Sequence, residues 1–260
     1  PRSMPPNSAS HSGDYARRQA ETIERSVIEN SDAVVAVTDA SLREIRRRYP
    51  AQPDRKWVMV PNGYDPKLLA HVPPPSPRTP GRMIVGHMGT AYRTASPRYY
   101  LDAVDRLPVS IRAGIETRFI GRVAETETAV FRNRLSEIRL LGFQPQHEAI
   151  RLAAACDYLL LTMTNDFSLP GKLFEYIALG RPVLALSPRG GEVDRLLQAA
   201  RAGWCAPHDH PPALQQLLID AWNRLEQGAR DFSPDWDVIR RYERPRLADW
   251  LYRELAARLP

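Results

Sequence analysis

Residues 158–186 read YLLLTMTNDFSLPGKLFEYIALGRPVLAL, and this stretch decides the fold. It starts with a short apolar run, passes through a polar loop, and resumes at Gly171 with apolar residues at helical spacing. A second apolar run, at 183–186, follows a Gly-Arg-Pro break. A strand, a helix and another strand in close succession predict one unit of a parallel α/β sheet.

The same alternation continues on both sides of this unit. The predicted strands are 83–87, 117–120, 139–141, 158–162, 183–186 and 204–206. The predicted helices are 98–106, 127–138, 147–155, 172–179, 192–200 and 212–226. This order predicts an α/β fold with a doubly wound, Rossmann-like parallel sheet, whose ligand binds beyond the carboxyl ends of the strands at the topological switch point.

The segments outside this sheet suggest a division of the chain into five parts. They are a flexible tail (1–14), a partial N-terminal α/β segment (15–71), a proline-rich linker (72–80), a ligand-binding domain (81–230) and a C-terminal helix (231–260). Pro245 should kink or break that last helix, which we place at about 235–258.

The partial N-terminal segment is predicted to contain two helices and two strands. The helices are 15–29 and one that ends at Arg48 and is capped by Asp39 or Ser41; the strands are 32–38 and 57–60. Two strands cannot form a stable open parallel sheet by themselves. The segment is therefore either the edge of a larger layer or an appendage on the second part.

Composition excludes several classes of protein. With 43% hydrophobic and 25% charged residues, the 260-residue chain is not wholly disordered, not collagen-like and not a coiled coil. No apolar run is long enough for a membrane span. Two cysteines, Cys156 and Cys205, are too few for a disulfide framework and indicate a reducing compartment.

The net charge of +6 suits a phosphate-bearing ligand or an anionic membrane surface. No RNA-recognition, zinc-finger or helix-turn-helix pattern is present, so we expect no nucleic-acid partner. His208-Asp209-His210 lacks a third ligand, and no metal site is expected there.

The helix that begins at Gly171 is the strongest candidate for a site. A helix N-terminus presents free N–H groups and a partial positive charge, which attract phosphate, and Lys172 adds a full charge. Lys172 is one of only three lysines in an arginine-rich chain. Glu175, one turn later, is placed to accept ribose hydroxyls. The alternatives are a solvated lysine on an ordinary turn and a glutamate that pairs with it.

Two further loops follow predicted strands. In Gly86-His87-Met88-Gly89, the glycines permit close backbone approach to a ligand, and Arg93 downstream can bind a diphosphate as a fork. An ordinary strand–helix turn explains the glycines equally well, and His87 reads equally as a core histidine. The loop at 142–148 is placed to hold a base through its main chain.

Taken together, the motifs resemble the GT-B glycosyltransferases, especially the large retaining bacterial group that acts in polysaccharide and lipopolysaccharide assembly. The resemblance covers about residues 20–258. It is carried by SDAVVAVTDASLREI (31–45), KWVMVPNGYDP (56–66), IVGHMGTAYRTASPRYYLDAV (84–104), LLGFQPQHEAIRLAAACDYLLL (140–161) and PGKLFEYIALGRPVLAL (170–186).

The resemblance implies roles for individual residues. The implied donor-binding residues are Gly89, Thr90, Gln144, Asp166, Ser168, Gly171, Leu173 and Glu175, and the implied catalytic residues are Lys172 and Arg93. Within this set Glu175 would hold the ribose, Gln144 would lie where the base is read, and the helix tip at 171–173 would receive the diphosphate. The family often has another glutamate eight positions before the one that matches Glu175. This chain has Phe167 at that position, beside Asp166.

The resemblance implies the donor-binding half of a glycosyltransferase that moves a sugar from a nucleoside diphosphate to a polysaccharide or lipid-linked acceptor. No metal or other cofactor is expected. We expect a cytoplasmic protein that works at the inner face of the membrane, with peripheral membrane association among its contacts. The segment before the linker is shorter than the family's first domain, so a truncated enzyme or a split subunit is expected. The alternatives are a nucleotide-sugar epimerase on the same architecture and a non-catalytic nucleotide-sugar-binding module.

Overall fold

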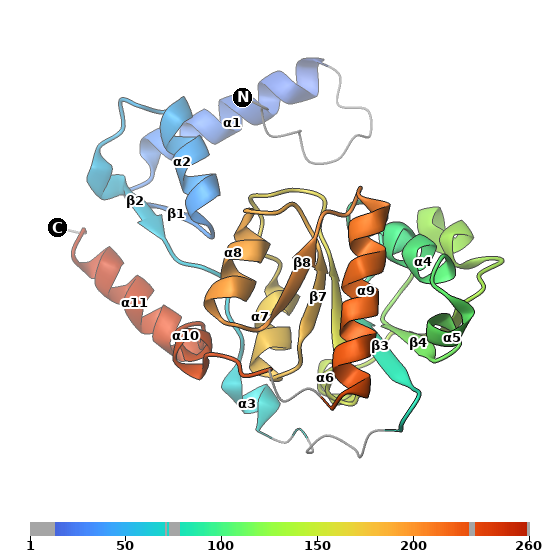
Figure 1. Cartoon of the computed structure of the whole chain (residues 1–260). Helices are drawn as coiled ribbons and strands as arrows, with labels where there is room; N and C mark the ends of the chain where they lie inside the picture. The colour runs from blue at the N-terminus through green and yellow to red at the C-terminus, as the bar shows by residue number, and fades with distance from the viewer. Residues whose placement is uncertain (1–13, 71, 73–78, 229–231, 259–260) are drawn as a thin grey trace.

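In the computed structural model of the chain, residues 14–70, 72, 79–228 and 232–258 are described. A six-stranded sheet lies at the centre, in the order β5-β4-β3-β6-β7-β8, and all of its neighbouring strands are parallel (Figure 1). Its strands are β3 (Met83–Met88), β4 (Ile115–Ile120), β5 (Glu137–Gly142), β6 (Tyr158–Thr162), β7 (Val183–Leu186) and β8 (Gly203–Ala206). The predicted doubly wound fold is confirmed, and its switch point lies between β3 and β6.

Helices cover both faces of this sheet. One face packs on α6 (Gln146–Ala154), α7 (Gly171–Ala178) and α8 (Glu192–Ala199). The other packs on α4 (Arg98–Asp105) and α9 (Pro211–Glu226) (Figure 1). The central strands are buried on both faces, as their unbroken apolar sequences require. This rigid double layer fixes the positions of the loops at the carboxyl ends of the strands.

The N-terminal segment forms a second, two-stranded parallel sheet. Its strands are β1 (Val34–Ala36) and β2 (Trp57–Met59), and its helices are α1 (Asp14–Asn30), α2 (Asp39–Arg48) and the short α3 (Pro66–Leu69). The predicted helices and parallel strands are present, although β1 is shorter than predicted. The cap of α2 is neither Asp39 nor Ser41: it is Thr38, whose hydroxyl accepts the Ser41 N–H.

The C-terminal segment returns to this small sheet. It contains α10 (Trp236–Arg240) and α11 (Arg244–Ala256), so the single helix predicted for 235–258 is broken, as Pro245 requires (Figure 1). Leu247 on α11 packs with Val58 and Val60. Tyr64 and Tyr242 also join main chains through an N–H···O bond of 3.0 Å. The small sheet and the C-terminal helices therefore pack together beside the large sheet.

One predicted helix is wrong. Residues 127–138 form no α-helix: a 3-10 segment, Glu125–Phe131, leads into β5. Phe131 stacks edge-on against Phe119, with ring centroids 4.9 Å apart. Ile138 lies opposite Thr117 of β4. Pairing with β4 and packing against the core outweigh a weak local preference for helix.

Most of the predicted tail (1–14) and most of the predicted linker (72–80) lie outside the described residues, which exclude 1–13 and 73–78. Asp14, placed in the tail by the sequence, is the first residue of α1. α5 (Val109–Arg112) and two short 3-10 segments, η1 (Asp54–Lys56) and η2 (Arg93–Ala95), complete the described elements.

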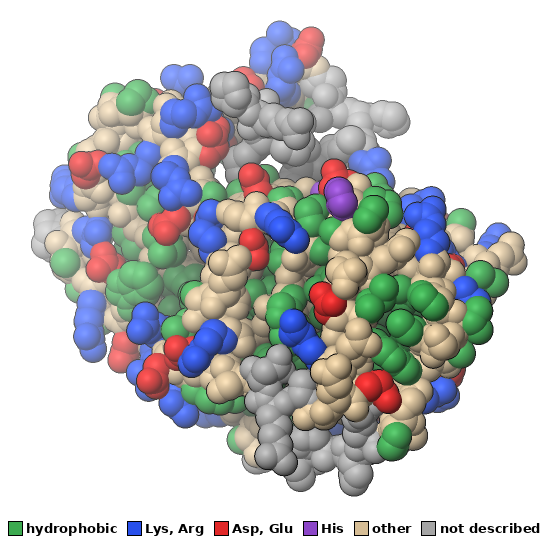
Figure 2. All heavy atoms as spheres, viewed as in Figure 1, with side chains coloured by type: hydrophobic (Ala, Val, Ile, Leu, Met, Phe, Trp, Pro, Cys, Tyr) green, Lys and Arg blue, Asp and Glu red, His purple; other side chains and the backbone are tan. Residues whose placement is uncertain are grey.

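Charge is dispersed over the visible surface. In Figure 2, basic side chains are interspersed with acidic ones rather than collected in one patch. No helix among the described residues is both long enough and apolar enough to cross a membrane.

Candidate functional site at the carboxyl edge of the sheet

The switch point brings together loops that are far apart in the sequence. β3 and β6 are neighbours, so the loop after Met88 and the loop from Met163 to Pro170 leave the same edge of the sheet. The hydroxyl of Thr164 donates to the Thr94 carbonyl at 3.5 Å, a contact between the two loops. The predicted site residues of both loops therefore lie along one edge, where ligands of doubly wound sheets bind.

Two glycines let main chains meet closely at this edge. Gly89 has a φ of 106° and Gly121 a φ of 151°. A Cβ built on Gly121 would lie 2.3 Å from the Gly89 carbonyl oxygen, so only glycine fits there. The Gly89 N–H donates to the Ile120 carbonyl at 2.8 Å. The first loop is thus held in place while Gly89 keeps an exposed, side-chain-free surface.

Helix α7 begins beside this loop. Pro170 precedes it and provides no side-chain cap. Among the described residues, the N–H groups of Gly171 and Lys172 have no hydrogen-bond partner. The turn before the helix is fixed by Asn165, whose Oδ1 accepts the Ser168 N–H at 2.9 Å. A helix tip with two free N–H groups is suited to an anion.

Leu173 does not fit its predicted role as a donor-binding residue. Its side chain is fully buried in the core, and its N–H donates to the Pro170 carbonyl at 3.0 Å. Neither group faces the edge. Leucine at this position anchors the helix, and among the described residues the first two N–H groups of α7 remain free for a ligand.

Lys172 extends from α7 across the edge of the sheet to β3. Its Nζ lies 3.3 Å from Nε2 of His87. No carboxylate lies within ion-pair distance of Lys172 among the described residues, and burial lowers the pKa of its ammonium from 10.5 to about 8. A Cβ built on Gly89 would lie 3.9 Å from this Nζ. The cation therefore sits beside the glycine loop with its charge uncompensated.

Glu175 lies one turn further along α7 and is half-buried. Its Oε1 accepts a hydrogen bond from Nε2 of Gln146 at 3.1 Å, and burial raises the pKa of its carboxyl above the usual 4.5. The predicted alternative, a pair with Lys172, is not formed, because Lys172 turns to His87 instead. Glu175 thus keeps one carboxylate oxygen without a partner among the described residues.

The loop at 142–148, which the sequence predicts to hold the base, forms hydrogen bonds of its own. Gln144 donates its side-chain N–H to the Leu141 carbonyl at 2.7 Å, so part of its amide serves its own loop. Gln146, which the sequence did not single out, is the residue that reaches Glu175. The guanidinium of Arg122 lies 5.1 Å from the centroid of the exposed Phe143 ring. The only sequence signal for Gln146 is its position at the start of α6.

Tyr176 was also missed, and it joins α7 to β3. Its hydroxyl accepts the Met88 N–H at 2.7 Å and faces the Met88 carbonyl at 3.3 Å, close enough to donate to it. The side chain is fully buried. These bonds hold the helix tip and the glycine loop at a fixed separation. An apolar helix face gives no sequence signal for such a bond.

The other predicted residues lie around the same edge. Thr90 and Arg93 are exposed, Arg93 on η2, and no ion pair of Arg93 is found among the described residues. Asp166 is exposed, and its main-chain carbonyl accepts the Glu192 N–H at 2.8 Å. Ser168 is half-buried in the turn before α7. The structure brings these groups to one edge without direct contacts between them.

The N-terminal segment contacts the loop that precedes α7. Thr38 donates its hydroxyl to the Phe167 carbonyl at 2.8 Å. Asn62 donates its side-chain N–H to the Leu169 carbonyl at 3.2 Å. The loop is therefore held between the two parts of the molecule. No local sequence pattern predicts these contacts.

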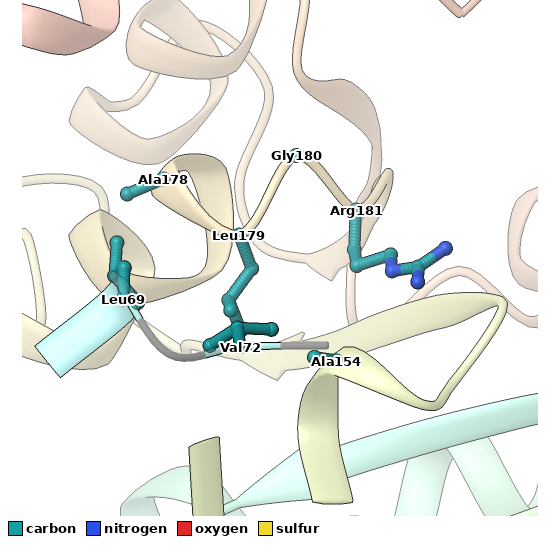
Figure 3. A pocket seen from close by; sticks show the side chains of 7 residues that line it. All are labelled: Leu69, Val72, Ala154, Ala178, Leu179, Gly180 and Arg181. Carbon is teal, nitrogen blue, oxygen red and sulfur yellow. The ribbon is translucent and has the colours of Figure 1, made fainter. Parts of the chain in front are cut away.

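A cavity of about 250 Å³ lies elsewhere, at the opposite end of α7 from Lys172. Apolar side chains from α3, α6 and the end of α7 line it, with Arg181 at one side (Figure 3). It contains none of the predicted site residues. In the described part of the chain, no three His, Cys, Asp or Glu side chains cluster closely enough to hold a metal ion. His210, from the histidine pair noted above, caps α9 by accepting the Ala213 N–H at 3.1 Å.

Comparisons with known proteins point to one family. The family model described as glycosyl transferases group 1 matches residues 82–224, more than half of the chain. The probable glycosyltransferase WbjE of Pseudomonas aeruginosa is 29% identical over 89 residues, which are 33% of this chain and 22% of that protein. The amylovoran biosynthesis glycosyltransferase AmsK of Erwinia amylovora is 32% identical over 117 residues, 43% of this chain and 27% of that protein. The matched region spans about a quarter of each of these curated relatives.

Solved structures show the same fold. HepE of Anabaena, in complex with UDP and glucose, gives a TM-score of 0.71 at 17% identity, over 96% of this chain and 69% of that one. WaaG, a glycosyltransferase involved in lipopolysaccharide biosynthesis, gives a TM-score of 0.67 at 17% identity, over 84% of this chain and 61% of that one. The predicted GT-B architecture is confirmed.

Proposed function

Because the chain belongs to the group 1 glycosyltransferases, we propose that its carboxyl edge binds a nucleoside diphosphate sugar and takes part in transfer of that sugar to an acceptor. The observation that carries the proposal is the uncompensated ammonium of Lys172 between the free N–H groups of α7 and the glycine loop. A cation without a carboxylate partner, half-buried beside a helix tip, is arranged for an anionic ligand.

Each part of the donor has a matching group along the edge. The diphosphate lies at the tip of α7, against the free N–H groups of Gly171 and Lys172, with the Lys172 ammonium beside Gly89 as its counter-charge. The free oxygen of Glu175 accepts the ribose hydroxyls, and Gln146 keeps that carboxylate in place. The base lies beside the loop that contains Phe143 and Gln144.

The chemistry supported by these residues is electrostatic. When the bond between the sugar and the diphosphate breaks, negative charge accumulates on the leaving diphosphate. Lys172 and the tip of α7 stabilise that charge, and the exposed guanidinium of Arg93 is within the same edge to assist. These groups can act without a metal, and we propose that none is required.

The relatives suggest which donor nucleotide and which class of acceptor to test. UDP is the first nucleotide to test, because HepE was solved with UDP and with UDP-glucose. The acceptor is a polysaccharide or lipid-linked intermediate, by likeness to AmsK and WaaG. We further propose retention of the anomeric configuration and a cytoplasmic location at the inner face of the membrane.

A thermal-shift panel tests the donor site. UDP, GDP, ADP and their nucleosides are added to the chain, since a ligand that binds the native state raises its stability by mass action. We expect one nucleoside diphosphate to raise the midpoint clearly more than its nucleoside does. No shift with any diphosphate would refute the donor site.

Transfer is tested with sugars of the nucleoside diphosphate that the panel selects and with a lipid-linked glycan acceptor, and the products are identified by mass spectrometry. A product one sugar heavier supports the enzyme. Isomerised nucleotide sugar without acceptor would identify an epimerase instead. Tight nucleotide binding with neither product, in the full-length protein as well, would favour a binding module.

A further inference from the structure

His87 is a buried titratable residue to which the proposed function assigns no role. It lies on β3 and is fully buried, with its ring centroid 5.6 Å from that of Phe119. Its Nδ1 lies 3.2 Å from the Leu160 carbonyl oxygen on the neighbouring strand. A carbonyl oxygen can only accept, so Nδ1 carries the proton of the neutral ring. Nε2 is left with a lone pair.

That lone pair faces Lys172. Nε2 lies 3.3 Å from Nζ, and the ammonium donates to it. Burial and the nearby charge of Lys172 hold the pKa of His87 well below its usual 6.5, so the ring remains an acceptor at neutral pH. The bond from Nδ1 to Leu160 therefore fixes the ring tautomer, and that tautomer leaves Nε2 as the acceptor for the ammonium of Lys172.

A neutral acceptor is the right partner for a cation that must bind an anion. A carboxylate in the same place would hold the ammonium more firmly, but it would also cancel the charge that a ligand needs. The imidazole holds Nζ beside Gly89 and leaves its charge uncompensated. Lysine has four rotatable side-chain bonds, so fixing its end removes freedom that ligand binding would otherwise have to remove.

We propose that His87 is a positioning residue, which holds the ammonium of Lys172 against the diphosphate of the donor through its Nε2 lone pair. The inference rests on the proposed function, because it assumes that Lys172 meets a diphosphate. A purely structural histidine would fill the same core position without this effect.

Two amide substitutions separate the bonds that the ring makes. Glutamine reaches the position of Nε2, so His87→Gln retains an acceptor for Lys172 and gives up the bond to Leu160. Asparagine reaches only the position of Nδ1, so His87→Asn retains a donor for Leu160 and gives up the acceptor. The two variants replace the same buried ring by the same polar group and differ in which bond survives.

Affinities are measured by calorimetry for the best diphosphate among UDP, GDP and ADP, for its nucleoside, and for inorganic pyrophosphate. We expect His87→Asn to weaken diphosphate and pyrophosphate binding by about tenfold or more, the loss typical of a hydrogen bond to a charged group, and to leave the nucleoside unchanged. His87→Gln should stay within about threefold of the wild type. Equal losses in both variants, no loss in His87→Asn, or an equal loss for the nucleoside would overturn the proposal.

Lys172→Met distinguishes failure of the inference from failure of the proposed function. If Lys172→Met binds the diphosphate as the wild type does, or if no diphosphate binds the wild type, the proposed donor site falls and the inference with it. If Lys172→Met loses affinity and His87→Asn does not, only the role of His87 is refuted. In the double variant we expect no loss beyond that of Lys172→Met alone.

A measurement on the unmodified chain covers the case in which the variants do not fold. Nitrogen-15 spectra of labelled histidine report which ring nitrogen carries the proton. At pH 7 we expect His87 to be neutral with the proton on Nδ1, and its Nε2 signal to move when the diphosphate binds. A protonated Nε2, a charged ring or an unmoved Nε2 signal would each overturn the proposal.

Discussion

Replacing Lys172 by methionine should stabilise the ligand-free protein while it removes diphosphate binding. The half-buried ammonium has no carboxylate partner among the described residues, and burial lowers its pKa from 10.5 to about 8. Such a depression costs the charged form about 3 kcal/mol in the folded state, at roughly 1.4 kcal/mol per tenfold change in proton affinity. Methionine preserves most of the apolar stem and carries no charge.

The net gain is smaller, because the substitution also leaves the Nε2 lone pair of His87 without its donor. An unsatisfied buried acceptor costs about 1–3 kcal/mol. The difference is a gain of about 0–2 kcal/mol in the free energy of unfolding at pH 7. Binding of the diphosphate should weaken at least about tenfold, with nucleoside binding unchanged.

The stability gained by Lys172→Met should depend on pH, because the wild-type ammonium loses its proton as the pH rises. A cation whose folded-state pKa is lowered destabilises the fold below that pKa, and the penalty is relieved as the pH rises from about 8 toward 10.5. The stability advantage of Lys172→Met should therefore be full at pH 7 and shrink above pH 8. Urea unfolding at pH 7, 8.5 and 9.5 measures it, and Lys67→Met, at an exposed lysine of α3, is the matched control. A destabilised Lys172→Met, or an advantage as large at pH 9.5 as at pH 7, would refute the reasoning.

Three further outcomes are expected at the same edge of the sheet. Glu175→Ala should weaken nucleotide binding by about ten- to 150-fold and narrow the preference for ribose over deoxyribose nucleotides, and calorimetry showing an undiminished preference would contradict the ribose role. Tyr176→Phe should lower the free energy of unfolding by about 1–3 kcal/mol, because it leaves the buried Met88 N–H unpaired, whereas Tyr252→Phe at an exposed position of α11 should change it little; equal urea midpoints for both would count against this bond. Affinity for the diphosphate should fall by up to about tenfold per pH unit above pH 8, where the ammonium of Lys172 is lost, and a constant affinity from pH 7.5 to 9.5 would show that this charge is not used.

The sequence alone determined the order of the elements and the position of the candidate helix. Apolar runs of strand length that alternate with helical spacing leave few options other than a doubly wound parallel sheet. Pro245 broke the last helix where its missing N–H and its ring predict a break. Gly171 and Lys172 were found from local features, because a strand, a loop and a helix start are encoded in neighbouring residues.

Local features did not settle the segment at 127–138 or the cap of α2. The first became a 3-10 segment and an edge strand because β4 supplied a pairing partner, which no local propensity contains. The second is Thr38, which also bonds to the Phe167 carbonyl on the far loop. Both outcomes depend on residues distant in sequence.

Only the tertiary structure decided how the site is assembled. His87 and Lys172 are separated by 85 positions in the sequence, and their contact depends on β3 lying beside β6 in the sheet. The same strand order places the Tyr176 hydroxyl on Met88. Local sequence fixes which groups are present, whereas long-range packing fixes which donor meets which acceptor, because a hydrogen bond needs its two atoms within about 3 Å and spacing along the chain does not set that distance.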